Sequence, residues 1–171
     1  MNLHPTFPLS LDQGSAQLIL MPCPGTKDAS LSASLKQLKD SSVAAIITLM
    51  TSQELEALSL GEIEEASKSL EMQWFHLAIE DDSIPDATFI ESWKTIREKI
   101  HALLDNGENI AIHCKGGSGR TGLVSGQILI ERGETLPVVI EKIQKLRPNA
   151  FRLDKHLDYI KSVEKRLKIA K

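Results

Sequence analysis

The chain has 171 residues, of which 42% are hydrophobic and 25% are charged, and these values are typical of one globular domain with a sizeable core. Its net charge of −3 argues against nucleic acid or an anionic membrane as a partner. No apolar run approaches the ~20 residues that span a bilayer, and no signal peptide is expected after Met1. Two cysteines are too few for a disulfide framework, so we expect a cytoplasmic setting, with a Cys23–Cys114 bridge left open.

Short apolar runs separated by turn residues predict the first elements. Residues 7–11 and 17–21 have β-type composition and flank a turn cluster, which predicts a hairpin. Leucines at helical spacing predict a helix over 31–40, and the continuous apolar run 44–50 predicts a strand that is buried on both faces. Two short helices are predicted over 53–58 and 62–70, and a further core strand over 74–79.

The second half of the chain predicts helices around one more strand. Asp86 is expected to cap a long helix that ends at 106–107. Its predicted inner stripe consists of Phe89, Ile90, Trp93, Ile96, Ile100, Leu103 and Leu104. Residues 110–113 form the predicted central strand, and helices are predicted over 121–132, 137–147 and 154–168. This alternation predicts an α/β fold, with a mostly parallel central sheet of about five strands flanked by helices, in one domain over residues 1–171 with its core at about 7–168.

Residues 109–122 carry the chemistry. The central strand ends in His113-Cys114, and three glycines within four residues lead to Arg120 and the next helix. Glycines let successive N–H groups turn inward, and a loop of this kind at a helix N-terminus binds anions. The stretch is not a Walker loop, because no Gly-Lys-Ser/Thr closes it. We therefore predict a phosphate site with a nucleophilic Cys114 beneath it.

The pattern His-Cys-x-x-Gly-x-x-Arg-Thr at residues 113–121 resembles the signature of the cysteine-dependent protein tyrosine and dual-specificity phosphatases. Residues 21–28 and 51–55 also resemble the kinase-associated phosphatase branch, which includes the phosphatase that acts on cyclin-dependent kinases. The similarity spans about residues 15–165. The resemblance implies a dual-specificity phosphatase-like fold and hydrolysis of phosphate monoesters through a phosphocysteine, without a cofactor. No metal is expected either, since His and Cys are too few and wrongly spaced for zinc.

The loop residues receive roles from their chemistry and from the resemblance. Cys114 is the expected nucleophile, because the helix N-terminus, the loop amides and Arg120 favour its thiolate; a buried inert thiol is the alternative. Arg120 offers a planar fork that can hold two phosphoryl oxygens. The resemblance implies that Thr121 stabilises the departing thiolate, although it could equally cap the helix. The backbone amides expected to bind phosphate belong to Lys115, Gly116, Gly117, Ser118, Gly119 and Arg120.

A general acid must protonate the leaving oxygen. Related phosphatases take this acid from a loop upstream of the nucleophile, and the spacing of Ile79, Asp81, Pro85 and Asp86 fits their pattern. Asp81 is the expected acid and Asp82 is its main competitor. Asp86 and Glu80 are the next candidates.

Three further residues are expected to support the site without reacting. By resemblance, His113 orders the loop, and Glu54 is a structural acid near it or else a carboxylate that stabilises a helix N-terminus. His156 stands where several related enzymes carry a glutamine that positions water, or it lies on a helix surface. Residues 147–150 resemble a segment that related enzymes place beside the site, whereas the basic C-terminal helix up to Lys171 is expected to be solvated.

The expected substrate is a phosphorylated protein carrying phosphotyrosine, phosphoserine or phosphothreonine, or another phosphate monoester. No recognition loop of the large tyrosine phosphatases is visible. The alternative enzyme is a phosphoinositide or inositol phosphate phosphatase. An alternative of another class is a catalytically silent phosphate-binding module, which would normally have lost Cys114, Arg120 or Asp81. The sequence leaves the physiological substrate and the oligomeric state open.

Overall fold

One five-stranded sheet, with the order β1-β2-β5-β3-β4, organises the computed structural model, which describes residues 2–170. Its strands are β1 (Phe7–Ser10), β2 (Gln17–Met21), β3 (Val43–Thr48), β4 (Gln73–His76) and β5 (Asn109–His113). The hairpin partners β1 and β2 are antiparallel, and all the other neighbours are parallel. The predicted α/β fold with a mostly parallel sheet is confirmed.

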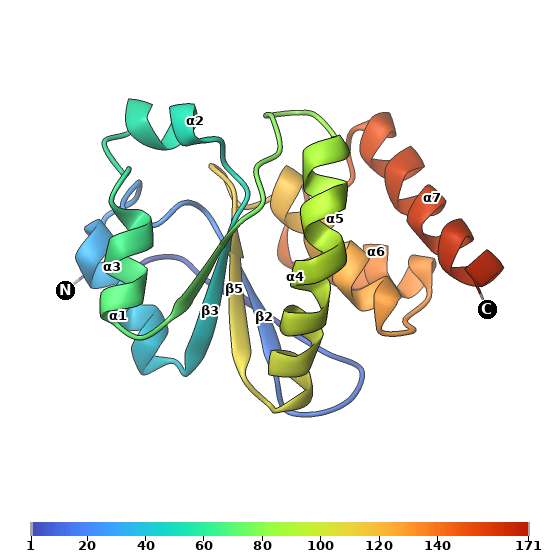
Figure 1. The fold of residues 1–171 in the computed structure, drawn as a ribbon, viewed down its shortest axis with the longest axis horizontal. Helices are drawn as coiled ribbons and strands as arrows, with labels where there is room; N and C mark the ends of the chain where they lie inside the picture. The colour runs from blue at the N-terminus through green and yellow to red at the C-terminus, as the bar shows by residue number, and fades with distance from the viewer. Residues whose placement is uncertain (1, 171) are drawn as a thin grey trace.

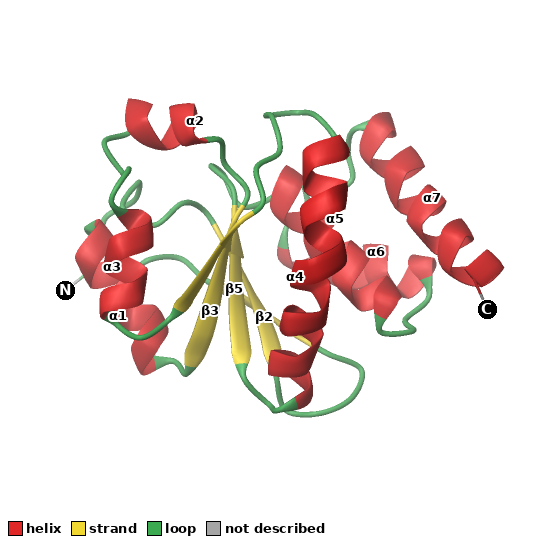
Figure 2. Ribbon diagram, in the orientation of Figure 1, coloured by secondary structure: helices red, strands yellow, loops and turns green. Residues whose placement is uncertain are grey.

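Seven helices in the described residues cover this sheet. They are α1 (Leu31–Asp40), α2 (Ser52–Ala57), α3 (Ile63–Ser69), α4 (Ala87–Asp105), α5 (Gly119–Glu131), α6 (Leu136–Leu146) and α7 (Asp154–Ala170). Figure 1 shows α1 and α3 on one face of the sheet and α4 to α7 on the other, with α2 beyond one end of the strands. Figure 2 shows the same three layers, with the strands in the middle. Each helix predicted from the sequence is present, with its ends shifted by at most two residues.

The central strand β5 is buried on both faces. Ile110 and Ile112 face the larger apolar cluster with α5, while Ala111, between them, faces the smaller cluster with Ile46. Because side chains alternate along a strand, a strand covered on both sides is apolar throughout. The carboxyl end of β5 therefore delivers His113 and Cys114 to a fixed place at the edge of the sheet.

Helix α5 follows directly and is buried along most of its length. At Gly122 an added Cβ would lie 2.7 Å from Cβ of Ala150 and 3.3 Å from Cγ2 of Ile143. Glycine is needed there because α6 and the segment after it pack closely against the first turn of α5. This close packing fixes the N-terminus of α5, which forms one wall of the candidate site.

Two local predictions need correction. The predicted strand 74–79 leaves the ladder after His76, although N–H groups of Leu77 and Ile79 still donate to carbonyls of β3 and the residue after it, each at 2.9 Å. Ile90 was placed on the inner stripe of α4, but it is 37% exposed. The buried stripe runs through Phe89, Trp93, Ile100 and Leu104, and Ile90 lies about 100° around the helix from Phe89.

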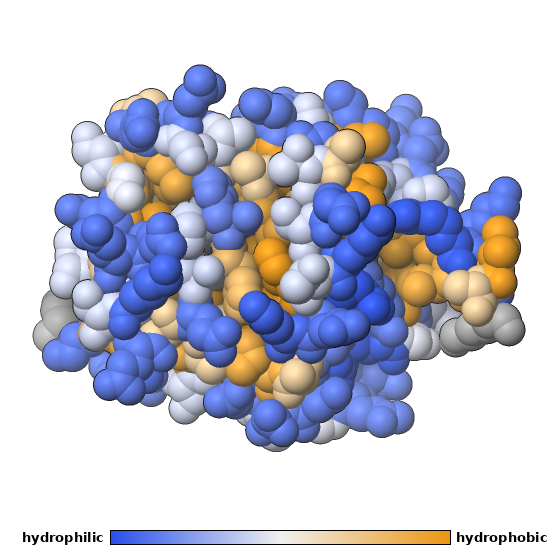
Figure 3. Space-filling view, in the orientation of Figure 1, coloured by the Kyte–Doolittle hydropathy of each residue, from blue (hydrophilic) through white to orange (hydrophobic). Residues whose placement is uncertain are grey.

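The surface is largely polar. The face in Figure 3 is mostly hydrophilic, with apolar residues showing in small groups between charged ones. The lysines of α7 at positions 161, 165 and 168 are exposed, as expected, and Lys171 lies outside the described residues. None of the helices within residues 2–170 is long and apolar enough to cross a membrane.

Candidate active site

The segment from Cys114 to Arg120, here called the glycine loop, connects the carboxyl end of β5 to the N-terminus of α5. It rests on the end of β2: the N–H of Cys23 donates to the carbonyl of Lys115 at 3.0 Å. Gly117 has a φ of 79°, and an added Cβ would lie 2.5 Å from backbone atoms of both Met21 and Pro22. Only glycine fits this position.

Cys114 lies at the base of the loop and is 4% exposed. Its Sγ accepts a hydrogen bond from the N–H of Gly117 at 3.3 Å and another from Oγ1 of Thr121 at 3.0 Å. A thiolate accepts such hydrogen bonds better than a neutral thiol does, and the positive end of α5 adds to the effect. The sulfur of Cys114 therefore faces two hydrogen-bond donors and the N-terminus of α5.

Arg120 is 2% exposed, and its guanidinium is oriented before any ligand binds. Nη1 and Nη2 donate to Oε1 and Oε2 of Glu54 at 2.7 and 2.9 Å, and Nη1 also donates to the carbonyl of Ile79 at 2.8 Å. A guanidinium has five N–H groups, so these contacts leave one on Nε and one on Nη2, along a single edge of the plane. Such an edge can hold two oxygens of one phosphoryl group.

Glu54 has both of the roles that the sequence suggested for it. Its carboxylate pairs with Arg120, and it also completes a capping box at the start of α2, with Thr51 N donating to Oε1 at 3.0 Å. Partial burial would raise the pKa of Glu54, but the hydrogen bonds from Arg120 and Thr51 bring it below its ordinary value. Burial would lower the pKa of Arg120, but Glu54 and the charges of Cys114 and Asp81 raise it. The ion pair therefore stays charged.

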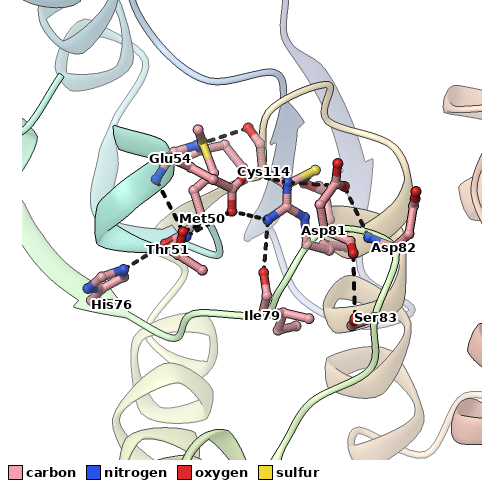
Figure 4. A network of polar contacts seen from close by, with 12 residues as sticks. Met50, Thr51, Glu54, His76, Ile79, Asp81, Asp82, Ser83 and Cys114 are labelled. Atoms are coloured by element: carbon pink, nitrogen blue, oxygen red, sulfur yellow. Dashed lines mark hydrogen bonds and ion pairs between the residues drawn. The ribbon is translucent and has the colours of Figure 1, made fainter. Parts of the chain in front are cut away.

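The loop after β4, here called the acid loop (residues 80–85), brings Asp81 to the same place. Oδ1 of Asp81 lies 3.4 Å from Nη2 of Arg120. Figure 4 shows Glu54 on α2, Cys114 on the glycine loop and Asp81 on the acid loop gathered from three distant parts of the chain. The N–H of Asp82 donates to Oδ1 of Asp81 at 3.1 Å. Asp86 caps α4 through the N–H of Phe89, and this capping role places it apart from the site.

These groups surround one pocket of about 520 Å³. Its lining residues are Thr26, Lys27, Leu58, Asp81, Asp82, Cys114, Lys115, Gly116, Ser118, Gly119, Arg120 and His156. The predicted phosphate-binding residues all line it except Gly117, whose N–H is turned to the sulfur of Cys114. Thr26 and Lys27 are additions that the sequence did not indicate. A cavity of about 560 Å³ between α4 and α5 contains neither Cys114 nor Arg120.

His113 is completely buried under the loop, and burial lowers its pKa to about 4. The ring is therefore neutral near pH 7. Nδ1 lies 3.2 Å from the carbonyl of Cys114, which can only accept, so Nδ1 carries the hydrogen. Nε2 then accepts from Oγ1 of Thr48 at 2.7 Å, and Thr48 in turn accepts from Nε1 of Trp74 at 2.8 Å. This chain of hydrogen bonds fixes the backbone at Cys114.

Arg147 holds the loop from outside. Its Nε donates to the carbonyl of Gly117 at 3.1 Å and its Nη2 to the carbonyl of Gly116 at 2.8 Å. The guanidinium carbon lies 4.2 Å from the ring centroid of Phe7. With these carbonyls occupied on the outer side, the loop amides face inward. The sequence placed residues 147–150 beside the site but gave Arg147 no role.

His156 is 2% exposed, so the view of it as a helix-surface residue is wrong. Its Nε2 donates to the carbonyl of Ser83 at 2.8 Å, and burial lowers its pKa.

Cys23 and Cys114 are both free, so the bridge left open by the sequence is absent. Burial, with the charges of Cys114 and Glu54, raises the pKa of Cys23 to about 12. Within residues 2–170 no cluster of His, Cys, Asp and Glu could hold a metal ion.

A family model described as a polymorphic toxin system, DSP-PTPase phosphatase matches residues 21–134. No curated protein matches the chain. Among solved structures, kinase-associated phosphatase with its catalytic cysteine replaced by serine has a TM-score of 0.87 at 24% identity over 98% of both chains. PTPMT1 in complex with PI(5)P has a TM-score of 0.71 at 21% identity, over 90% of this chain and 93% of that one.

Human DUSP28 gives a TM-score of 0.69 at 15% identity, over 98% of this chain and 99% of that one. At these identities the three structures establish the fold. The family model covers two thirds of the chain and includes both Cys114 and Arg120. The resemblance noted in the sequence is thus confirmed: the chain belongs to the DSP-PTPase family and is a cysteine-dependent phosphatase.

Proposed function

We propose that the chain hydrolyses phosphate monoesters on phosphotyrosine and on phosphoserine or phosphothreonine proteins, with Cys114 as nucleophile. The observation that carries this proposal is the shared pocket: Cys114, Arg120 and Asp81 all line it. Attack, charge stabilisation and proton transfer need these three groups within reach of one phosphoryl group.

In the first step the loop amides and Arg120 bind the phosphoryl oxygens. Sγ of Cys114 attacks phosphorus in line, so that an S–P bond forms as the bond to the leaving oxygen breaks. Asp81 gives its proton to that oxygen. The charge that collects on the phosphoryl oxygens is stabilised by donors that are already in place.

In the second step water attacks the phosphocysteine. Asp81 takes a proton from the water, the S–P bond breaks, and inorganic phosphate leaves. Thr121 Oγ1 and Gly117 N–H, both directed at the sulfur, stabilise the departing thiolate. The hydroxyl of Thr121 thus serves the sulfur in both the resting enzyme and the breakdown of the intermediate.

A phosphoinositide or inositol phosphate is the second candidate substrate. Lys27 and Lys115 both line the pocket and are exposed, so they could meet a second anionic group. PTPMT1, which has the same fold, has been crystallised with PI(5)P. Phosphate release from matched panels of phosphopeptides and short-chain phosphoinositides decides between the two. Release from the lipids alone would replace the protein substrate with the lipid one.

Replacing Cys114 by serine tests the nucleophile. The variant should fold and bind phosphorylated ligands, but turnover of an aryl phosphate should vanish, because a serine hydroxyl ionises far less readily than a thiol. Turnover like that of the wild type would exclude the mechanism. Wild-type protein that binds phosphopeptides and never releases phosphate would show a binding module instead.

Asp81→Asn and Asp82→Asn form a matched pair that tests the acid. General acid catalysis contributes about 10²–10⁴-fold, so Asp81→Asn should lower kcat by about that factor on an alkyl phosphate and by less on an activated aryl phosphate. It should also flatten the basic limb of the pH–rate profile. Asp82→Asn should cost only a few-fold on either substrate. The reverse pattern would move the acid to Asp82, and no effect in either would direct the search to Glu80 or Asp86.

A further inference from the structure

Two side chains hold the acid loop, one on each side of Asp81. Arg120 Nη1 donates to the carbonyl of Ile79, two residues before Asp81, at 2.8 Å. His156 Nε2 approaches the carbonyl of Ser83, two residues after Asp81, also at 2.8 Å. The side chain of Asp81 is itself 68% exposed, so packing does not fix it. Its place over the pocket depends on its backbone.

The His156 ring fits closely between the two loops. It stands in the first turn of α7 and is 2% exposed. The end of the glycine loop also lies against the ring, because a Cβ added at Gly119 would be 3.6 Å from Cε1 of His156. A carbonyl only accepts, so Nε2 carries the hydrogen in this contact. The imidazole therefore joins the acid loop to the N-terminus of α5.

The acid loop contains a turn with an uncommon backbone conformation. Asp82 has a φ of 56°, in the left-handed region that few residues other than glycine, asparagine and aspartate adopt. The turn is closed by Ser83 N donating to the carbonyl of Glu80 at 3.0 Å. When the carbonyl of Ser83 is not held, the chain can relax toward ordinary backbone angles. Asp81, one residue before this position, would then move away from the pocket.

We propose that His156 is a positioning residue that holds Asp81 in place for proton transfer to the leaving group. The inference rests on the proposed function, in which Asp81 is the acid. A histidine that only filled space would act equally on every substrate. One that positions the acid acts on those substrates whose leaving oxygen needs a proton.

The test compares kcat/KM for a phenyl phosphate, which has a poor leaving group, with kcat/KM for a nitrophenyl phosphate, which has a good one. This ratio reports the first step, in which the leaving group departs, and leaves out the hydrolysis of the phosphocysteine that both substrates share. His156→Leu fills similar space but removes the donor. It should lower kcat/KM about tenfold or more on the first substrate and only a few-fold on the second, since misplacement by about 1 Å can cost 10²-fold. It should also weaken the basic limb of the pH–rate profile. His156→Gln, which keeps an N–H donor, should restore most of the rate.

Asp81→Asn is measured in the same assay, alone and combined with His156→Leu. If both residues act through one proton transfer, the double variant should be little worse than Asp81→Asn. Lys161→Ala, an exposed change on α7, is the control and should leave both rates unaltered. Should His156→Leu not fold, His156→Asn takes its place, because its shorter side chain cannot reach Ser83.

Equal losses on both substrates, or a glutamine variant as slow as the leucine variant, would overturn the proposal while leaving Asp81 as the acid. A double variant whose losses multiply would overturn it too. If Asp81→Asn shows no dependence on the leaving group, Asp81 is not the acid and the role of His156 fails with it. The Cys114→Ser result stands apart from both, so the failures are distinguishable.

Discussion

Replacing Gly117 by alanine perturbs the glycine loop at the point where it touches the end of β2. Gly117 has a φ of 79°, and its added Cβ would meet the carbonyl carbon of Met21 and the nitrogen of Pro22, each at 2.5 Å. Both are backbone atoms of a strand end and cannot rotate away. Gly116, the preceding residue, has nothing within 4 Å of an added Cβ, so it is the matched control.

The size of the effect follows from two terms. Holding alanine in the left-handed region costs about 1–2 kcal/mol, and forcing a methyl group into a filled space costs about 1–3 kcal/mol. Together they predict a loss of about 2–5 kcal/mol for Gly117→Ala, a large part of the ~5–15 kcal/mol by which domains are stable. Gly116→Ala should change the free energy of unfolding by less than about 0.5 kcal/mol.

Urea unfolding of the two variants measures the stability, and inhibition of aryl phosphate hydrolysis by orthovanadate measures the oxyanion site. Gly117→Ala could also relieve the clash by turning the loop away from β2. In that case stability is kept, but the amides no longer converge and the affinity for vanadate falls. If Gly117→Ala matched Gly116→Ala in both stability and vanadate affinity, the contact of Gly117 with Met21 and Pro22 would not determine the shape of the loop.

Two further predictions concern the buried groups around the loop. Cys114 should be modified before Cys23 by mild peroxide, with vanadate protecting it, because Cys114 lines the pocket while the raised pKa of Cys23, about 12, keeps it a thiol. Mass spectrometry that found Cys23 oxidised first in active enzyme would contradict this. Burial lowers the pKa of His113 from 6.5 to about 4, so the unfolded state binds a proton at this residue first as the pH falls. This difference contributes up to about 3 kcal/mol of stability above pH 6.5, and the contribution is lost progressively as the pH falls to about 4. Urea unfolding across that range checks it, and a free energy of unfolding that stayed constant would refute it.

The fold was predictable because the inner strands β2, β3 and β5 are buried on both faces and therefore appear as short apolar runs. The run 74–79 shows the limit of that signal: apart from His76 its residues are apolar up to Ile79, but the backbone leaves the ladder after His76. The loss of pairing is set by where β3 ends, and no residue in the run itself records it. An apolar pattern gives the burial of side chains and says less about where the backbone ladder stops.

The site was predictable where it is contiguous. Cys114, Arg120 and Thr121 lie within eight residues. Glu54 meets Arg120 across 66 residues, and the sequence predicted no such pairing: a place near the loop was one of two alternatives for Glu54. Thr48 and Trp74 orient His113, but nothing in the sequence around them indicates this role. Their chemistry depends on strand order, which brings β3 beside β5.

The burial of His156 could have been predicted from its sequence spacing to other residues of α7. It precedes Tyr159, Ile160 and Val163 by three, four and seven residues, which is the buried stripe of α7. A histidine in such a stripe needs a hydrogen-bond partner, and the sequence cannot name that partner because it lies on the acid loop, 73 residues away.

The pairing of Arg120 with Glu54 also has a thermodynamic consequence. An arginine side chain carries about 2 kcal/mol of rotamer entropy, which a flexible surface arginine would lose on capturing an anion. Here the side chain has lost that freedom during folding, since three of its five N–H groups are already bonded. Oxyanion binding should therefore carry a small entropic penalty, and the cost of an ordered anion site falls on the stability of the free enzyme.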